Sequence, residues 1–238
     1  MILLGIDLET TGLDTSSCEI IEVGAVLWDT GTHQIVRTYS TLVKNQQPIP
    51  EDVQKLTGIT QGLVDRFGTS WSTVLTFLNR LQGECDYLVG HNAKGYDAEI
   101  LARMGMEFGR PWIDTTQDVP YPAEIKTRKL THLAAEHRFV NPFPHRAVTD
   151  VLTTLQILSF YQPEEIERYA KADSKTVVAQ FERSDPEFES KKEVVKRNRY
   201  RWTGAPEYQW RKTLKDFQVE EECVLLAKDG IIVSTLNT

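Results

Sequence analysis

Residues 2–12 read ILLGIDLETTG, and this stretch decides which fold we expect for the chain. Its apolar beginning predicts a buried β-strand from Ile2 to Glu9. Because side chains two residues apart on a strand point to the same side, Asp7 and Glu9 can present both carboxylates to one point. Such a pair suits metal binding, although an acidic pair at a strand end can also be merely solvated. The stretch therefore predicts a sheet with a candidate site at the end of its first strand.

Two further strands are expected directly after this one. The apolar run Ile20–Trp28 predicts a second buried strand. The turn residues 29–31 then lead into Ile35–Val43, where alternating apolar and polar side chains predict a partly solvated strand. The tight connections between these runs favour an antiparallel meander.

The pattern changes after Pro48 and Pro50, where helical spacing alternates with short extended runs. Strands followed by alternating helices and strands are typical of an α/β protein, so we expect a central mixed sheet with helices on its faces. The expected elements are helices at Glu51–Leu56, Thr69–Leu81, Asp97–Met104, Leu130–His137 and Arg146–Tyr161, a strand at Tyr87–Gly90 and an extended piece at Pro111–Thr115.

Length and composition limit the class of protein. The 238 residues, 40% of them hydrophobic, can bury the core of one domain, which we expect over residues 1–162. A formal net charge of -7 argues against a uniformly basic surface, so a polyanionic partner must meet a local patch. Three widely spaced cysteines indicate neither a disulfide framework nor a zinc site. Without a basic leader or an apolar stretch of roughly 20 residues, we expect a soluble, cytoplasmic protein with no membrane association.

The C-terminal part differs in character from the rest. Residues 163–190 are charged and lack a strong apolar stripe, so we expect a linker or peripheral helices. Residues 191–238 are expected to form a small basic, aromatic, hairpin-like extension closed by Val224–Val233. Its first part, Lys191–Lys215, contains nine basic and two acidic residues, whereas residues 1–190 contain seventeen basic and twenty-seven acidic ones. A net-acidic part of the chain is therefore followed by a basic segment, Lys191–Lys215, which we call the basic arm.

Aromatic residues interleave with the basic ones in this arm. Trp202, Trp210 and Arg211 can bind nucleic acid, with the arginine neutralising a phosphate and a tryptophan stacking on a base. Alternatively, the tryptophans form a small core and the hairpin is only solvated. The composition of the arm favours both interpretations equally.

A second motif, HNAKGYD, ends at Asp97. Asp97 follows a buried strand and opens a helix, a position where functional residues often lie, but an aspartate there can equally cap the helix. We expect His91 and Asn92 to hold this loop by hydrogen bonding rather than to react.

A third motif, HRAVTD, runs from His145 to Asp150. On one continuous helix these two side chains would point about 140° apart and could not meet at one site. Pro142 and Pro144 instead predict that His145 lies in the loop before the helix, from which both side chains can reach one cleft. An ordinary surface histidine is the alternative.

With DLETTG, HNAKGYD and HRAVTD in this order, the chain resembles the DEDDh exonucleases, the DnaQ-like group that includes proofreading subunits, RNase T and the TREX enzymes. The resemblance covers about residues 1 to 161 and matches all five signature positions. It implies a ribonuclease H-like exonuclease fold, in which a mixed sheet carries the acidic residues at its edge. This agrees with the order of strands and helices expected above.

The resemblance also implies roles for the five signature residues. Two divalent cations, Mg²⁺ or Mn²⁺, would be held by hard oxygen donors around the scissile phosphate. Asp7 would bridge both ions and Asp97 would bind one of them, largely through water. Glu9 and Asp150 would complete the coordination of the other ion. His145 would act as general base toward the attacking water.

The residues after the first motif would hold the 3′-terminal nucleotide. An aromatic wall would come from the second motif, where Tyr96 stands in place of the phenylalanine common in the family. The expected substrate-binding residues in this domain are Thr10, Thr11, Gly12, Leu13, Asn92 and Tyr96.

The expected function is that of a metal-dependent 3′-5′ exonuclease that converts nucleic acid with single-stranded 3′ ends, DNA favoured, into nucleoside 5′-monophosphates. An RNA 3′-end trimming exoribonuclease of the RNase T type is the alternative within the enzyme class, because nothing in the motifs reads the 2′-hydroxyl. A non-catalytic nucleic-acid-binding or polymerase-accessory module is the alternative from another class. A polymerase or repair partner is expected, since the chain contains no polymerase motif of its own.

Overall fold

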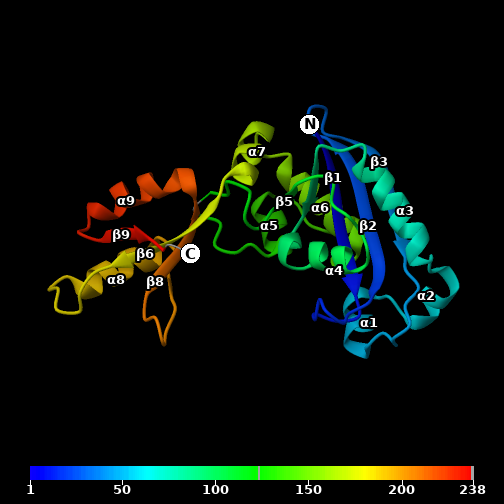
Figure 1. Cartoon of the computed structure of the whole chain (residues 1–238), viewed down its shortest axis with the longest axis horizontal. Coiled ribbons are helices and arrows are strands. Elements are labelled where there is room, and N and C mark those ends of the chain that lie inside the picture. Colours follow the sequence, from blue (N-terminus) through cyan, green and yellow to red (C-terminus); the bar gives the residue numbers. More distant parts are fainter. Residues whose placement is uncertain (123, 237–238) are drawn as a thin grey trace. The chain divides into compact units, whose positions relative to one another are not determined.

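The computed structural model describes residues 1–122 and 124–236. The chain divides into two compact units, Met1–Ala170 and Lys171–Thr238, each with its own sheet (Figure 1). Among the described residues, every helix is too short or too polar to cross a lipid bilayer.

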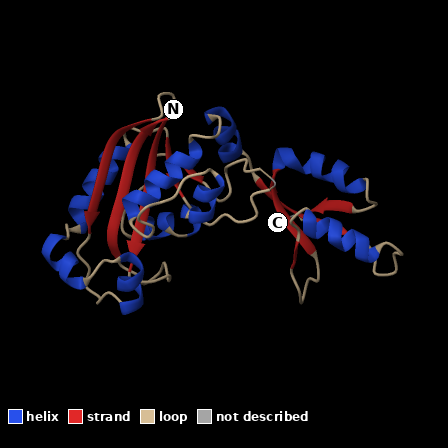
Figure 2. Cartoon of the chain, turned by 180° about the vertical axis from the view of Figure 1, so that it is seen from behind, coloured by secondary structure: helices blue, strands red, loops and turns tan. Residues whose placement is uncertain are grey.

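The first unit is built on a five-stranded mixed sheet in the order β3-β2-β1-β4-β5. The first three strands form the expected antiparallel meander, β4 pairs parallel to β1, and β5 pairs parallel to β4. Figure 2 shows the long strands of this sheet in red, with helices on both of its sides. The strands are β1 (Ile2–Thr10), β2 (Ile20–Asp29), β3 (Gln34–Leu42), β4 (Tyr87–Gly90) and β5 (Trp112–Asp114).

The five expected helices of this unit are present to within a few residues at each end, and α2 (Gln61–Phe67), the short 3₁₀ helix η1 (Ala93–Gly95) and α7 (Pro163–Lys171) are additional to them. Helix α2 was not expected from the sequence because it is short; the side chain of Thr60 caps it by accepting a hydrogen bond from the Leu63 N–H. The expected helices are α1 (Glu51–Thr57), α3 (Trp71–Gln82), α4 (Asp97–Arg103), α5 (Leu130–Glu136) and α6 (Ala147–Leu158).

The two faces of β1 contact different helices. Leu4, Ile6 and Leu8 are buried in a cluster that includes residues of α3 and α4. Leu3 is buried in the other cluster, with residues of α5 and α6. Because alternate residues of a strand share a face, Asp7 lies on the α6 side of the sheet. The sheet therefore directs the side chains of Asp7 and Glu9 toward α6.

The second unit is a four-stranded antiparallel sheet in the order β7-β8-β6-β9, with two helices in the connections. This is the connectivity of a split βαβ, or ferredoxin-like, arrangement. Its core includes residues from β6, β8, α8 and α9. The elements are β6 (Ser174–Gln180), α8 (Phe188–Arg197), β7 (Arg201–Trp202), β8 (Trp210–Lys215), η2 (Asp216–Gln218), α9 (Val219–Ala227) and β9 (Ile232–Thr235).

Two expectations for this part of the chain are wrong. Residues 163–190 are not merely a linker or peripheral helices, because β6 lies inside them and pairs on both sides within the second sheet. Only the run Val177–Ala179 is apolar there, which is too short to stand out among charged neighbours. Val224–Val233 does not close the hairpin as a strand, since the C-terminal part of α9 and the start of β9 occupy it. Three glutamates in the first turn favour this helix through its dipole.

Candidate active site

Strand β1 carries two carboxylates toward its C-terminal end, on the side that faces α6. Asp7 lies opposite Gly24 of β2, and Glu9 lies opposite Glu22. A Cβ atom on Gly24 would approach the backbone nitrogen of Val148 to 2.3 Å, so the missing side chain allows α6 to lie directly against the sheet. This close contact brings the first turn of α6 next to the acidic end of β1.

Asp97 is the first residue of α4, and only 4% of its surface is exposed. Its Oδ1 accepts a hydrogen bond of 3.0 Å from the Leu8 N–H, which lies between the two acids of β1. The N-cap position belongs to Tyr96, which makes no side-chain capping bond. The carboxylate of Asp97 is therefore directed to β1, and the alternative of a simple helix cap does not describe it.

His145 lies outside α6, in the preceding loop, as Pro142 and Pro144 predicted. Its φ of 61° is in the left-handed region, where the chain turns before the helix begins at Ala147. The His145 N–H donates to Oδ2 of Asp150 at 3.2 Å, and Asn141 donates to Oδ1 of the same carboxylate. The loop and the first turn of α6 therefore hold each other in place.

These elements bring the signature residues together. Ligand atoms of Glu9, His145 and Asp150 all lie within 4.8 Å of one another. Asp7 is close enough to Asp97, Asp150 and Glu9 that all three raise its pKa. The structure thus gathers four carboxylates and one imidazole from β1, α4, α6 and the loop before α6.

Burial and mutual repulsion oppose the charged forms of these acids. Burial, followed by repulsion from Asp97 and Asp150, raises the pKa of Asp7 well above its ordinary value. Burial, and then Asp150 and Glu22, raise the pKa of Glu9 to about 8, whereas Arg146 lowers it. Burial raises the pKa of Asp97 to about 7 despite its bond from the Leu8 N–H. Such crowding stores electrostatic repulsion that a bound cation would relieve.

The donor set fits divalent cations such as Mg²⁺ or Mn²⁺. Carboxylate oxygens are the hard donors that these ions prefer, and the four acids together supply more negative charge than the single nearby arginine compensates. The partly exposed groups Glu9 and Asp150 lie beside the exposed His145, so the cluster is accessible from solvent.

Glu22 and Arg146 belong to this site, although sequence reasoning did not single them out. Glu22 is buried on β2, and its two oxygens accept bonds from Arg146 Nε at 3.2 and 3.1 Å and from Arg146 Nη2 at 2.6 Å. Its Oε2 also accepts the Ala147 N–H at 2.9 Å. The pair therefore ties β2 to the first turn of α6. A single acid inside the otherwise apolar run Ile20–Trp28 was the available signal.

The expected substrate-binding residues of the first motif form a small hydrogen-bonded group. The hydroxyls of Thr10 and Tyr96 lie 2.5 Å apart, and both are within hydrogen-bond distance of the Gly12 carbonyl oxygen, at 2.8 and 2.6 Å. Thr11 is buried and its hydroxyl accepts the Glu19 N–H at 2.9 Å. Leu13 is 90% exposed. Tyr96 therefore joins the second motif to the loop after β1, at whose end an apolar side chain faces solvent.

The loop of the second motif is organised around Asp114, at the end of β5. Asp114 accepts the N–H of Asn92 at 3.0 Å and of Lys94 at 3.1 Å. His91 bonds through Nδ1 to the Thr115 hydroxyl at 2.8 Å. Asn92 has a φ of 63°, so it also forms the turn that opens this loop. His91 therefore holds the loop through its side chain, as expected, whereas Asn92 does so through its backbone N–H.

Comparison with known proteins identifies the family. The sequence model of the RNase T family, described as an exonuclease family, matches residues 4–158. The chain belongs to this exonuclease family. The matched residues contain all five signature residues of the site described above. The matched residues lie within the first unit, which therefore contains the exonuclease-family domain.

Curated relatives of this exonuclease domain include two kinds of DNA polymerase III protein. The PolC-type DNA polymerase III of Thermotoga maritima is 35% identical over 158 residues, which are 64% of this chain and 11% of that protein. The DNA polymerase III subunit epsilon of Aquifex aeolicus is 31% identical over 158 residues, or 64% of this chain and 76% of that protein. The chain thus spans only about a ninth of the length of the PolC-type relatives.

Solved structures confirm the fold of the exonuclease domain. The nuclease domain of 3′hExo, described as a DEDDh family member bound to rAMP, superposes with a TM-score of 0.56 at 22% identity, covering 67% of this chain and 90% of that one. Exonuclease I of E. coli in complex with a dA16 oligonucleotide superposes with a TM-score of 0.58 at 15% identity, covering 75% and 48%. The ribonuclease H-like exonuclease fold expected from the motifs is therefore confirmed.

Three further expected substrate-binding residues lie in the second unit. Trp202 and Trp210 lie opposite each other on β7 and β8, and Arg211 follows on β8. Trp210 packs partly against the core of this unit, whereas Trp202 is 49% exposed. The alternative in which the tryptophans form a small core therefore holds in part for Trp210, but it does not account for the exposure of Trp202.

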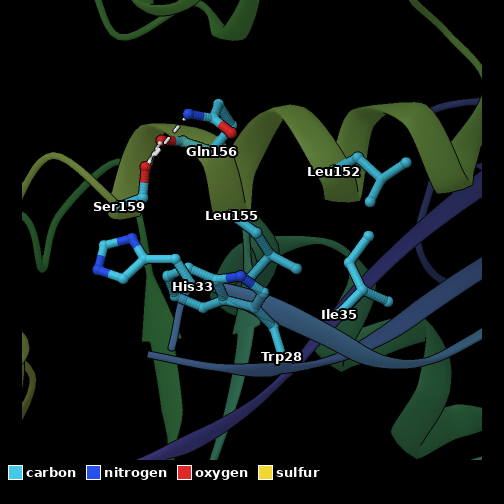
Figure 3. Close-up of a pocket in the computed structure, with 7 residues that line it drawn as sticks. All are labelled: Trp28, His33, Ile35, Leu152, Leu155, Gln156 and Ser159. Atoms are coloured by element: carbon cyan, nitrogen blue, oxygen red, sulfur yellow. Dashed lines mark hydrogen bonds between the residues drawn. The ribbon is translucent and has the colours of Figure 1, made fainter. Parts of the chain in front are cut away.

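A pocket of about 200 Å³ in the exonuclease domain contains none of the signature residues. It lies between β2, the start of β3 and the second half of α6, as Figure 3 shows. Gln156 and Ser159 are hydrogen-bonded to each other at its rim, which leaves His33 as the remaining polar side chain in its lining. The chemistry described above lies elsewhere, at the C-terminal end of β1.

Proposed function

We propose that the chain is a metal-dependent 3′-5′ exonuclease that hydrolyses single-stranded nucleic acid ends, DNA favoured, to nucleoside 5′-monophosphates. The observation that carries this proposal is the convergence of Glu9, His145 and Asp150 within 4.8 Å, next to Asp7 and Asp97. Membership in an exonuclease family supports the same reaction class.

We assign metal binding to Asp7, Glu9, Asp97 and Asp150. Two Mg²⁺ or Mn²⁺ ions held there would supply positive charge at the scissile phosphate and lower the pKa of a bound water. The raised pKa values of Asp7 and Glu9 support this assignment, because these acids lack enough positive charge in the protein alone. Asp97 is fixed against β1 because its Oδ1 accepts the Leu8 N–H.

His145 is assigned the role of general base. It lies at the exposed side of the cluster, and a neutral imidazole nitrogen can take a proton from water near physiological pH. Its backbone N–H donates to Asp150, which holds the loop without using a ring nitrogen. The proton can then leave to solvent from this exposed side chain.

The substrate side of the site is assigned to the hydrogen-bonded group after β1. Thr10, Thr11 and Gly12 would meet the terminal sugar, and the exposed Leu13 would pack against a base. The bonds from Thr10 and Tyr96 to the Gly12 carbonyl oxygen support this role, because they hold the loop in one shape before the substrate arrives. Asn92 would contribute through the loop of the second motif.

DNA is favoured as the polymer, with a polymerase as the proposed partner. Relatives of the matched domain are the epsilon subunit and the PolC type of DNA polymerase III, and a structural relative was solved with a dA16 oligonucleotide. RNA trimming is the second candidate, favoured by the structural relative bound to rAMP. A non-catalytic module is disfavoured, since it would not require an intact cluster of five signature residues.

The test compares 5′-labelled single-stranded DNA, duplex DNA and RNA, with free and blocked 3′ ends, in Mg²⁺, Mn²⁺ or chelator. Successive shortening from free 3′ ends only, abolished by chelator, is the expected result. Asp7→Ala and His145→Ala should abolish cleavage with the fold retained, and Asp52→Ala, at an exposed acid on α1, should leave cleavage unchanged. Wild-type activity in the Asp7→Ala protein would refute the assignment.

A further inference from the structure

The β7–β8 hairpin places two positive charges directly opposite each other. Arg201 and Arg211 are cross-strand partners, so their side chains share one face of the sheet. Like charges in this position destabilise a strand pair. Neither guanidinium has a carboxylate partner among the described residues, and Arg211 Nε donates only to the neutral Oε1 of Gln209, at 3.0 Å. The hairpin therefore has an unbalanced charge pair that an anion would stabilise.

Four lysines of the same unit are balanced within it. They form ion pairs of 2.5 to 2.9 Å with carboxylates of the unit itself, so they add little net positive potential. Less of the positive charge of this arm is therefore unpaired than its composition suggests, and the two hairpin arginines are part of what remains. The balanced pairs are Lys191–Asp185, Lys192–Glu189, Lys196–Glu193 and Lys212–Glu222.

The opposite face of the same two strands is aromatic. Trp202 and Trp210 are cross-strand partners with ring centroids 5.3 Å apart, and Tyr208 lies 6.3 Å from Trp202. Trp210 anchors the group against the core, whereas Trp202 and Tyr208 are 49% and 61% exposed. Large aromatic rings that stay exposed beside arginines are suited to stacking on unpaired bases.

Both features are reachable from one edge of the sheet. β7 is the edge strand and has only two residues, Arg201 and Trp202, whose side chains point to opposite faces. In a nucleotide the phosphate and the base lie on different sides of the sugar. A strand that passes along this edge can therefore place a phosphate at the arginine pair and a base against Trp202.

We propose that the β7–β8 hairpin binds single-stranded nucleic acid, with Arg201 and Arg211 contacting phosphate and with Trp202 and Tyr208 stacking on bases. A duplex does not fit this chemistry as well, because its bases are already stacked on each other. The inference rests on the proposed function in that the bound strand is taken to be the substrate.

The binding test uses the full chain and labelled oligothymidylate or oligouridylate in chelator, so that no cleavage occurs. Fluorescence anisotropy gives the Kd at several salt concentrations. Arg201→Gln/Arg211→Gln should lower the slope of log Kd against log salt by about 0.7, since each phosphate contact on a single strand contributes about 0.7 and the pair holds one phosphate. Trp202→Ala/Tyr208→Ala should weaken binding by roughly 5- to 150-fold for each stacked base lost, with the slope unchanged.

The matched control is Lys192→Gln/Lys196→Gln, which removes two positive charges that are already paired. It should leave the salt slope close to that of the wild type. The proposal would be overturned if the control lowered the salt slope as much as the arginine variant does. It would also be overturned if both hairpin variants kept the affinity and the salt slope of the wild type. If the aromatic variant unfolds, the arginine variant decides alone, because its substitutions lie outside the core.

A second assay separates this inference from the proposed function. The p-nitrophenyl ester of thymidine 5′-phosphate offers a phosphodiester without a strand, and the hairpin variants should hydrolyse it at the wild-type rate in Mn²⁺. Failure of the wild type to hydrolyse any substrate would remove the proposed function. The Kd values measured in chelator would still decide whether the hairpin binds a single strand.

Discussion

Replacement of Gly24 by alanine tests how the site is assembled. Gly24 lies opposite Asp7 on β2, where α6 contacts the sheet through its backbone. An added Cβ would meet the nitrogen of Val148 at 2.3 Å and the carbonyl carbon of Ala147 at 2.4 Å. Both atoms belong to the backbone of the helix, so no side chain can rotate away to make room.

The size of the effect follows from these distances. Ordinary contact begins near 3.4 Å, so the first turn of α6 must move away by about 1 Å. Overpacking of this kind typically costs about 1 to 3 kcal/mol. For a chain of this length that corresponds to a fall in Tm of roughly 2 to 12 °C. Because this turn carries Asp150, a misplacement of about 1 Å is expected to lower the cleavage rate roughly 100-fold.

The assay combines thermal unfolding with the rate of cleavage of a 5′-labelled strand in Mg²⁺. Gly62→Ala is the matched control, because nothing lies within 4 Å of a Cβ at that position in α2 and its φ is not left-handed. Alanine there should stabilise the protein by about 0.4 to 1 kcal/mol with unchanged cleavage. A Gly24→Ala protein with wild-type Tm and rate would refute the claim that backbone contact between β2 and α6 positions Asp150.

Two further outcomes follow from the charges of the site. Glu22→Gln weakens the attachment of β2 to Arg146 and to the Ala147 N–H. The substitution should lower the free energy of unfolding by about 1 to 3 kcal/mol and the cleavage rate about 10- to 100-fold. A melting curve and a cleavage rate equal to those of the wild type would contradict this prediction. In chelator, the folded protein retains protons on Glu9 up to a pKa of about 8 and on Asp97 up to about 7, whereas ordinary carboxyls lose theirs near 4. The free energy of unfolding should therefore fall as pH rises from about 5 to 8, and Mn²⁺ should restore it at pH 8; melts that do not change over this range would count against the crowded site.

Much of the exonuclease domain could be predicted because its signals are local. The apolar run before Asp7 and the prolines before His145 each depend on a few neighbouring residues, and the observed elements begin and end close to the predicted positions. Glu22 was missed because its role depends on Arg146, which is 124 residues away. The sequence of β2 shows only that one acidic residue lies among apolar ones, and it does not indicate which residue pairs with that acid.

The second unit was harder to predict for a related physical reason. β6 is short and has charged flanks, and it is stable because β8 and β9 pair with it on both sides. Its neighbours in space are more than 25 residues away in sequence, so no local pattern marks it as a central strand. Helix α9 was mistaken for part of a hairpin because a short apolar run is compatible with a helix or a strand.

The sequence by itself determined the chemistry that this protein can carry, since the spacing of its three motifs fixes which residue types lie at a strand end, a helix start and a loop. Tertiary structure decided what surrounds them. The contact of α6 with Gly24, the pair of Glu22 with Arg146, and the opposition of Arg201 to Arg211 all join residues that chain order leaves apart. The physical reason is that charge balance and close packing act over distances of a few ångströms in space, and only the folded chain sets those distances.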